Sequence, residues 1–134
     1  LVIVPSEKSY QGVPLVLNQE DVRSLQLAKG AVRAAIEILM RESGTKVEAL
    51  KAVFLAGAFG NYLNPEHAIK AGILPAVNPD LIHNLGNAAG RGAICYLINP
   101  QARQQMGQMK QNLTCVELAD HPDFQLLFLR HIDF

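Results

Sequence analysis

The run Val53-Phe54-Leu55-Ala56-Gly57-Ala58-Phe59-Gly60-Asn61 decides the fold class of this chain. Its apolar first half predicts a strand covered on both faces, so we expect Val53, Phe54 and Leu55 to form a central buried strand, flanked by a helix over 22–41. Gly57 then breaks the strand, and a glycine there lets the backbone turn with a positive φ and leaves room for a ligand. Because ligands of α/β sheets bind at the carboxyl ends of strands, the turn is a candidate binding site. A tight turn without a ligand fits the pattern equally well.

A long helix is predicted before this strand, from Gln19 to about Ser43. Asn18 is a suitable N-cap, and Gly44 is placed to end the helix. Apolar residues cover two faces of this helix. We therefore expect it to be largely buried, packed against a sheet on one side and against another element on the other.

Gly30 lies in the middle of this helix, next to Lys29 on its polar stripe. A glycine there fits a flat ligand lying against the helix, and it fits a tight contact between two helices equally well. Lys29 and Arg33 then either meet phosphate or ribose oxygens or point into solvent.

The run Gly86-Asn87-Ala88-Ala89-Gly90-Arg91-Gly92 is a second glycine-rich junction between a strand and a helix. Each glycine in a helix interior costs roughly 1 kcal/mol relative to alanine. We expect close approach of the helix to a neighbour or a ligand to compensate, and packing is the commoner of these two reasons.

The remaining elements follow from caps and apolar periodicity. We expect strands over 2–4, 13–17, 81–83 and 113–118, and helices from Asn64-Pro65 to Gly72, over 87–98, from Asn99-Pro100 to about Asn112, and after Pro122. The order of strands and helices predicts an α/β layer fold with parallel strands.

Composition excludes several classes of function. The 134 residues carry twelve basic and twelve acidic side chains without a basic block, which argues against a nucleic-acid partner. No apolar run reaches the ~18 residues of a membrane span, so we expect no membrane and a cytoplasmic protein. The glycine spacing is neither G-x-G-x-x-G nor that of a P-loop. Cys95, Cys115 and the four histidines show no metal-ligand spacing, so we expect buried free thiols and no metal or cluster bound by this chain.

Four segments together resemble one known family, the ATP-dependent reductive activators of corrinoid proteins. They are Gln19 to Ala34, Val53 to Glu66, Gly86 to Gly90 and Pro122 to Gln125. The resemblance runs from about Leu15 almost to the C-terminus. It implies the second lobe of an actin-like (ribonuclease H-like) ATPase, an α/β fold with a mixed sheet and helices on both faces. Residues 1–134 would be a single domain, one C-terminal lobe of a larger multidomain protein.

The resemblance also implies site residues. Gly57, Ala58, Phe59, Gly60 and Asn61 look like the adenosine motif of the superfamily, and Lys29 and Gly30 would form the facing wall of the adenine pocket. The stretch Gly86, Asn87, Ala88, Ala89 and Gly90 resembles the second inter-lobe connecting segment. The family motif usually has two adjacent glycines, where this chain has Gly57-Ala58.

The function implied for the full-length protein is ATP-dependent return of corrinoid Co(II) to Co(I). ATP and Mg²⁺ would bind between two lobes, and a [2Fe-2S] cluster in a ferredoxin-like domain outside this chain would deliver the electron. The partner would be a corrinoid iron–sulfur protein of a methyl-transfer system, with a homodimer as a compatible assembly. The phosphate loop D-x-G-S/T is absent from these residues. The chain alone is therefore expected to be no enzyme and to offer half a site.

Two alternatives remain open. The chain could be a partner-docking or dimerisation module without nucleotide binding. It could also be a lobe of a metabolite kinase, which is less favoured because Gln26 to Gly30 and Gly86 to Gly90 look like the activators.

Overall fold

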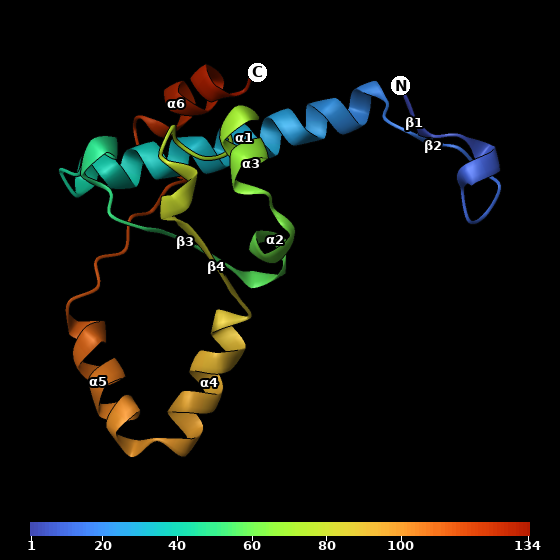
Figure 1. Ribbon diagram of the computed structural model, residues 1–134. Helices are drawn as coiled ribbons and strands as arrows, with labels where there is room; N and C mark the ends of the chain where they lie inside the picture. Colours follow the sequence, from blue (N-terminus) through green and yellow to red (C-terminus); the bar gives the residue numbers. More distant parts are fainter.

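The computed structural model describes the backbone of residues 1–134 and every side chain except those of Ala58, Phe59 and Asn61. The chain contains helices and small strand pairs in mixed order, which confirms the α/β class (Figure 1). In chain order the elements are β1 (Val2–Val4), β2 (Leu15–Val16), α1 (Gln19–Glu42), β3 (Val53–Ala56), α2 (Gly57–Tyr62), α3 (Pro65–Lys70), β4 (Ile82–Gly86), α4 (Ala88–Ile98), α5 (Pro100–Gln111) and α6 (Phe124–His131).

Helix α1 begins and ends where local chemistry predicts. The Asn18 side chain accepts a hydrogen bond from the Asp21 backbone N–H at 2.9 Å, and the Asp21 carboxylate accepts one from the Asn18 N–H at 2.9 Å. This reciprocal capping box satisfies two backbone donors that no helical carbonyl can reach. At the other end Gly44 adopts a φ of 63°, a left-handed conformation that glycine adopts without strain.

Two buried clusters lie on different sides of α1. On one side Ala34 and Ile38 of α1 pack against Leu127 of α6. On the other side Ile36 packs against the cluster formed by Ala68, Ile73, Leu74 and Ile82. Helix α1 therefore lies between a parallel strand pair and a second helix, as its two apolar faces predict.

The predicted burial of α1 is nevertheless wrong along much of its length. Leu25, Leu27, Val32 and Leu39 each leave more than 40% of their surface exposed. The two clusters engage α1 mainly from Ala34 to Ile38, so the described residues cover the apolar side chains beyond them only in part.

The strands form two separate pairs. Strands β1 and β2 pair antiparallel with Val2 opposite Val16, and β3 and β4 pair parallel with Val53 opposite Ile82. Both kinds of pairing that a mixed sheet requires are present, but the part of the chain that the structure describes holds them as two separate two-stranded sheets.

Two sequence predictions about strands are wrong. Strand β3 is not buried on both faces, because Val53 and Leu55 pack into the core whereas Phe54, on the other face, is 62% exposed. Residues 113–118 form no strand. Val116 and Leu118 instead pack sideways onto the α1–α6 cluster, which satisfies their apolar character without pairing.

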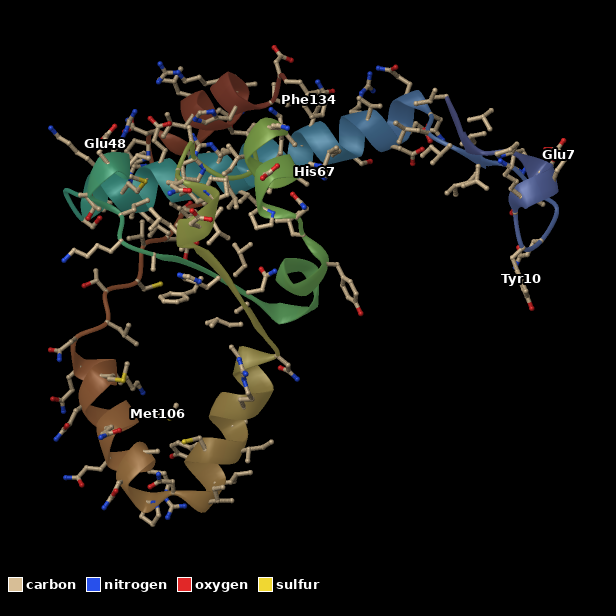
Figure 2. The ribbon with its side chains drawn as sticks, in the orientation of Figure 1. Glu7, Tyr10, Glu48, His67, Met106 and Phe134 are labelled. Carbon is tan, nitrogen blue, oxygen red and sulfur yellow. The ribbon has the colours of Figure 1, made fainter. Side chains whose placement is uncertain are left out.

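The chain exposes much more surface than a compact monomer of its size. Its accessible area is 10190 Å², whereas a compact 14.6 kDa protein would expose about 6,900 Å². Helices α4 and α5 form a V that stands away from α1, and the β1–β2 hairpin projects beyond the N-terminal end of α1 (Figure 1). Tyr10 at the tip of that hairpin points into solvent (Figure 2). Cys95 and Cys115 are both exposed, so the expectation of buried thiols is wrong.

Candidate nucleotide-binding site

The register of the parallel pair brings the two glycine-rich segments together. At its last position Ala56 of β3 lies opposite Gly86 of β4. Because the strands are parallel, the turn that starts at Gly57 and the junction that follows Gly86 leave the sheet at the same carboxyl edge, and α2 packs against β4. This edge is where ligands bind in open α/β sheets.

The turn at Gly57 is open on its outer side. Gly57 has a φ of 88°, and a Cβ atom placed on it would meet no atom within 4 Å. Gly60, by contrast, folds back on the strand, because its Cβ would come within 2.9 Å of the Leu55 Cβ. Ala58, Phe59 and Asn61 belong to α2, but their side chains lie outside the residues that the structure describes.

The junction at Gly86–Gly90 is held by its own side chains. The Asn87 side-chain oxygen accepts a hydrogen bond from the Gly90 N–H at 2.8 Å and caps α4, which begins with Ala88 and Ala89. A Cβ on Gly90 would lie 2.6 Å from the Asn87 amide nitrogen, so this close approach accounts for the glycine. The Arg91 guanidinium donates to the Leu85 carbonyl and ties the helix to the end of β4. Sequence reasoning gave Arg91 no role.

Lys29 and Gly30 lie against α6. A Cβ on Gly30 would lie 3.3 Å from the Phe128 carbonyl oxygen and 3.4 Å from the Ile132 Cα. Of the two explanations that the sequence left open for Gly30, tight helix–helix contact accounts for it. The Lys29 ammonium donates a hydrogen bond to the Asp133 carbonyl. The nucleotide contact expected of Lys29 and Gly30 stays a prediction.

A charged cluster fastens α6 to α1. The Glu37 carboxylate is 2.8 Å from the His131 ring nitrogen and 2.5 Å from the Arg41 guanidinium. These hydrogen bonds, that from His131 first, hold the pKa of Glu37 below its usual range. Burial lowers the pKa of Arg33, and the nearby Glu37 carboxylate opposes this. Because Glu37 and His131 are 94 positions apart, no local pattern could have predicted this pairing.

Other features of the structure contribute nothing to the candidate site at the carboxyl edge of β3 and β4. An apolar pocket of about 310 Å³ lies at the start of β3, with Ala52 and Val53 in its lining, at the opposite end of the strand from Gly57. Among the described side chains no group of three histidines, cysteines or carboxylates is arranged to hold a metal ion. Within the described part of the chain, no helix has both the length and the apolar character to cross a bilayer.

Two glycine-rich turns at one carboxyl edge of a parallel pair, backed by a long helix, are the features expected of a lobe of the actin-like fold class. Residues 1–134 match the family described as the C-terminal domain of RACo, the ASKHA domain. The chain belongs to this family.

Proteins similar to this chain are named as corrinoid activators. It is 32% identical over 132 residues to the corrinoid activation enzyme RamQ of Eubacterium limosum, which covers 98% of this chain and 22% of RamQ. It is 33% identical over 86 residues to the Co(II) methylated amine-specific corrinoid protein reductase of Methanosarcina barkeri, which covers 64% of this chain and 16% of the reductase.

A solved structure of a reductive activator for a corrinoid, iron–sulfur protein has the same fold. It superposes with a TM-score of 0.87 and 27% identity, over 98% of this chain and 21% of that chain. Almost all of this chain is matched in RamQ and in the solved activator, but it spans only about a fifth of the length of each.

Proposed function

We propose that this chain is the nucleotide-binding lobe of an ATP-dependent reductive activator that returns corrinoid Co(II) to Co(I). The relatives with such names support the reaction class. In the proposal ATP binding and hydrolysis drive the uphill electron transfer, and the partner is a corrinoid protein of a methyl-transfer system. The protein would act in the cytoplasm.

The observation that carries the proposal is the placement of Ala56 opposite Gly86 at the end of the parallel pair. This register lies next to both the turn at Gly57 and the junction after Gly86, and it supports a shared site at this edge. No described atom lies within 4 Å of the position that a Cβ atom on Gly57 would take, so the backbone is open to approach on that side. Backbone N–H and C=O groups of the turn can then bind the adenosine, with Gly57 to Asn61 as the proposed contact residues.

The described residues fit an adenosine better than they fit a magnesium triphosphate. A triphosphate needs cationic or backbone phosphate ligands, and Mg²⁺ needs carboxylate or water oxygens in octahedral geometry. The phosphate loop D-x-G-S/T is absent from these residues. We therefore assign adenosine binding to this chain, and we assign the phosphate and Mg²⁺ ligands, with phosphoryl transfer, to other parts of the full-length protein.

The [2Fe-2S] cluster of the proposal also lies outside this chain. A cluster of this type is held by four cysteine thiolates. This chain has two cysteines, of which Cys95 lies in α4 and Cys115 lies beyond α5.

The exposed surface favours a second function, docking or dimerisation. The chain exposes about 3,300 Å² more than a compact protein of its mass. That excess exceeds the ~800 Å² that one partner buries in a standard interface. A lobe of this kind could bind a partner or a second copy without binding a nucleotide.

A matched pair of glycine variants in the full-length protein separates these functions. Gly57→Val fills the open space above the turn and strains a residue with a φ of 88°. Gly44→Val strains a residue with a φ of 63° that also faces open space, but it lies after the end of α1 and outside the proposed adenosine turn. Both variants carry a backbone penalty of about 1–2 kcal/mol.

We expect Gly57→Val to weaken ATP binding at least about tenfold, equivalent to 1.4 kcal/mol. Gly44→Val should bind ATP as the wild type does. Titration calorimetry on folded proteins measures both. Unchanged ATP affinity of the Gly57 variant would remove the adenosine assignment and favour the docking function.

A further inference from the structure

Lys29 is an unusual residue for its position, because its charged side chain is buried. Only 4% of its surface is exposed, and among the residues that the structure describes no other charged side chain is buried. Removing an ammonium group from water is unfavourable unless other groups replace its hydration. The contacts of Lys29 should therefore show why a lysine stands there.

The ammonium group of Lys29 meets three segments that are distant in sequence. It extends from α1 and donates a hydrogen bond to the Asp133 carbonyl beyond α6. It lies 4.7 Å from the centre of the Phe134 ring, within the range of a cation–π contact. A Cβ on Gly72, in the turn after α3, would lie 3.1 Å from the ammonium nitrogen. Figure 2 shows Phe134 at the end of the chain that follows α6, and its ring meets Lys29 of α1.

These contacts do not form a binding site for an anion. Among the described residues no carboxylate lies within 4.0 Å of the ammonium group, so neutral groups replace its hydration: a carbonyl and an aromatic face. A phosphate or ribose could reach the ammonium group only if residues 133–134 first moved away. The α6 backbone already fills the space above Gly30.

We propose that Lys29 is a latch that fixes residues 132–134 and the turn at Gly72 to α1. A lysine suits this role because its long apolar stem runs through a packed interface and its ammonium group donates at the far end. The latch acts in the folded lobe itself and holds whether or not the edge at Gly57 binds a nucleotide. Lys29 is thereby a residue that positions the turn at the end of α3.

Hydrogen exchange on the full-length protein without nucleotide tests the latch. Lys29→Met keeps the length and apolar stem of the side chain and removes its charge. We expect amides of 126–134 and of 71–74 to exchange about tenfold faster, the effect of losing one cation–π contact and one hydrogen bond. Lys110→Met is the matched control, since it makes the same change on the exposed surface of α5. It should leave both segments unchanged.

Phe134→Leu approaches the latch from its exposed partner and decides the question if Lys29→Met does not fold. It should accelerate exchange at 71–74 as well as at 126–134, although the substituted residue belongs only to 126–134. The double variant with Lys29→Met should exchange little faster than Lys29→Met alone. The latch is refuted if either variant leaves 71–74 protected as in the wild type. It is also refuted if Lys29→Met weakens ATP binding while exchange in both segments stays unchanged, since Lys29 would then be a nucleotide ligand.

Discussion

Gly30→Val should detach α6 from α1. The Cβ of any larger residue at position 30 already lies 3.3 Å from the Phe128 carbonyl oxygen and 3.4 Å from the Ile132 Cα, both backbone atoms. Valine adds two methyl groups beyond that Cβ. Because backbone atoms cannot rotate away as side chains do, the whole helix α6 has to shift.

The expected size of the effect follows from three contributions. Valine in a helix interior is favoured over glycine by about 0.3 kcal/mol. Overpacking costs about 1–3 kcal/mol, and a shift of α6 exposes part of Leu127, whose full burial is worth about 1.5–3 kcal/mol. We therefore expect a net loss of about 2 kcal/mol in the stability of the α1–α6 contact, or about thirtyfold faster hydrogen exchange in α6.

Hydrogen exchange measured by mass spectrometry on the full-length protein resolves α6 from the other helices. Gly107→Val is the matched control, because Gly107 lies within α5 and its Cβ would meet nothing within 4 Å. That variant should leave exchange in α6 unchanged. Wild-type protection of α6 in the Gly30 variant would refute the packing argument. Weaker ATP binding without a change in α6 would instead restore Gly30 to the adenine wall.

Three further predictions concern the caps, the charges and the ligand. Because the pKa of Glu37 is lowered in the folded protein by the hydrogen bond from His131 and then by Arg41, its stabilising effect is present at neutral pH and is lost as the pH falls below about 4.5. Exchange in α6, corrected for intrinsic rates, should accelerate over that range in the wild type but not in Glu37→Gln. Asn87→Ala removes the cap on the Gly90 N–H and should destabilise α4 by about 1 kcal/mol. Hydrogen exchange should then become faster in the first turn of α4, and unchanged exchange there would contradict the role of the cap. This chain alone should bind ATP with a dissociation constant on the order of millimolar, and micromolar binding in a calorimeter would refute the half site.

The sequence predicted those features that depend on neighbouring residues. Asn18 and Gly44 mark the ends of α1, because capping chemistry acts over three or four positions. The break at Gly57 and the helix start at Asn87 follow from the same local reasoning. The order of elements also predicted parallel strands, as β3 and β4 are, but it did not say which strands pair.

Features set by distant segments escaped prediction. Periodicity placed Lys29 on the polar stripe of α1, but the residue is buried by segments near position 72 and near position 133. The apolar run of β3 predicted cover on both faces, but the described residues leave 62% of Phe54 exposed. An apolar residue shows in sequence that it will be covered, and only the fold shows by which segment.

Helix α6 is synthesised long after the part of α1 that it covers. Ala34 and Ile38 leave the ribosome before Leu127, which covers them and follows roughly 90 residues later. At about 5–20 residues per second this delay lasts about 5–20 s. During that interval the apolar face of α1 is open to chaperones and to neighbouring nascent chains. A premature stop codon before Phe124 would leave the face open permanently, so such truncated chains should be found in aggregates.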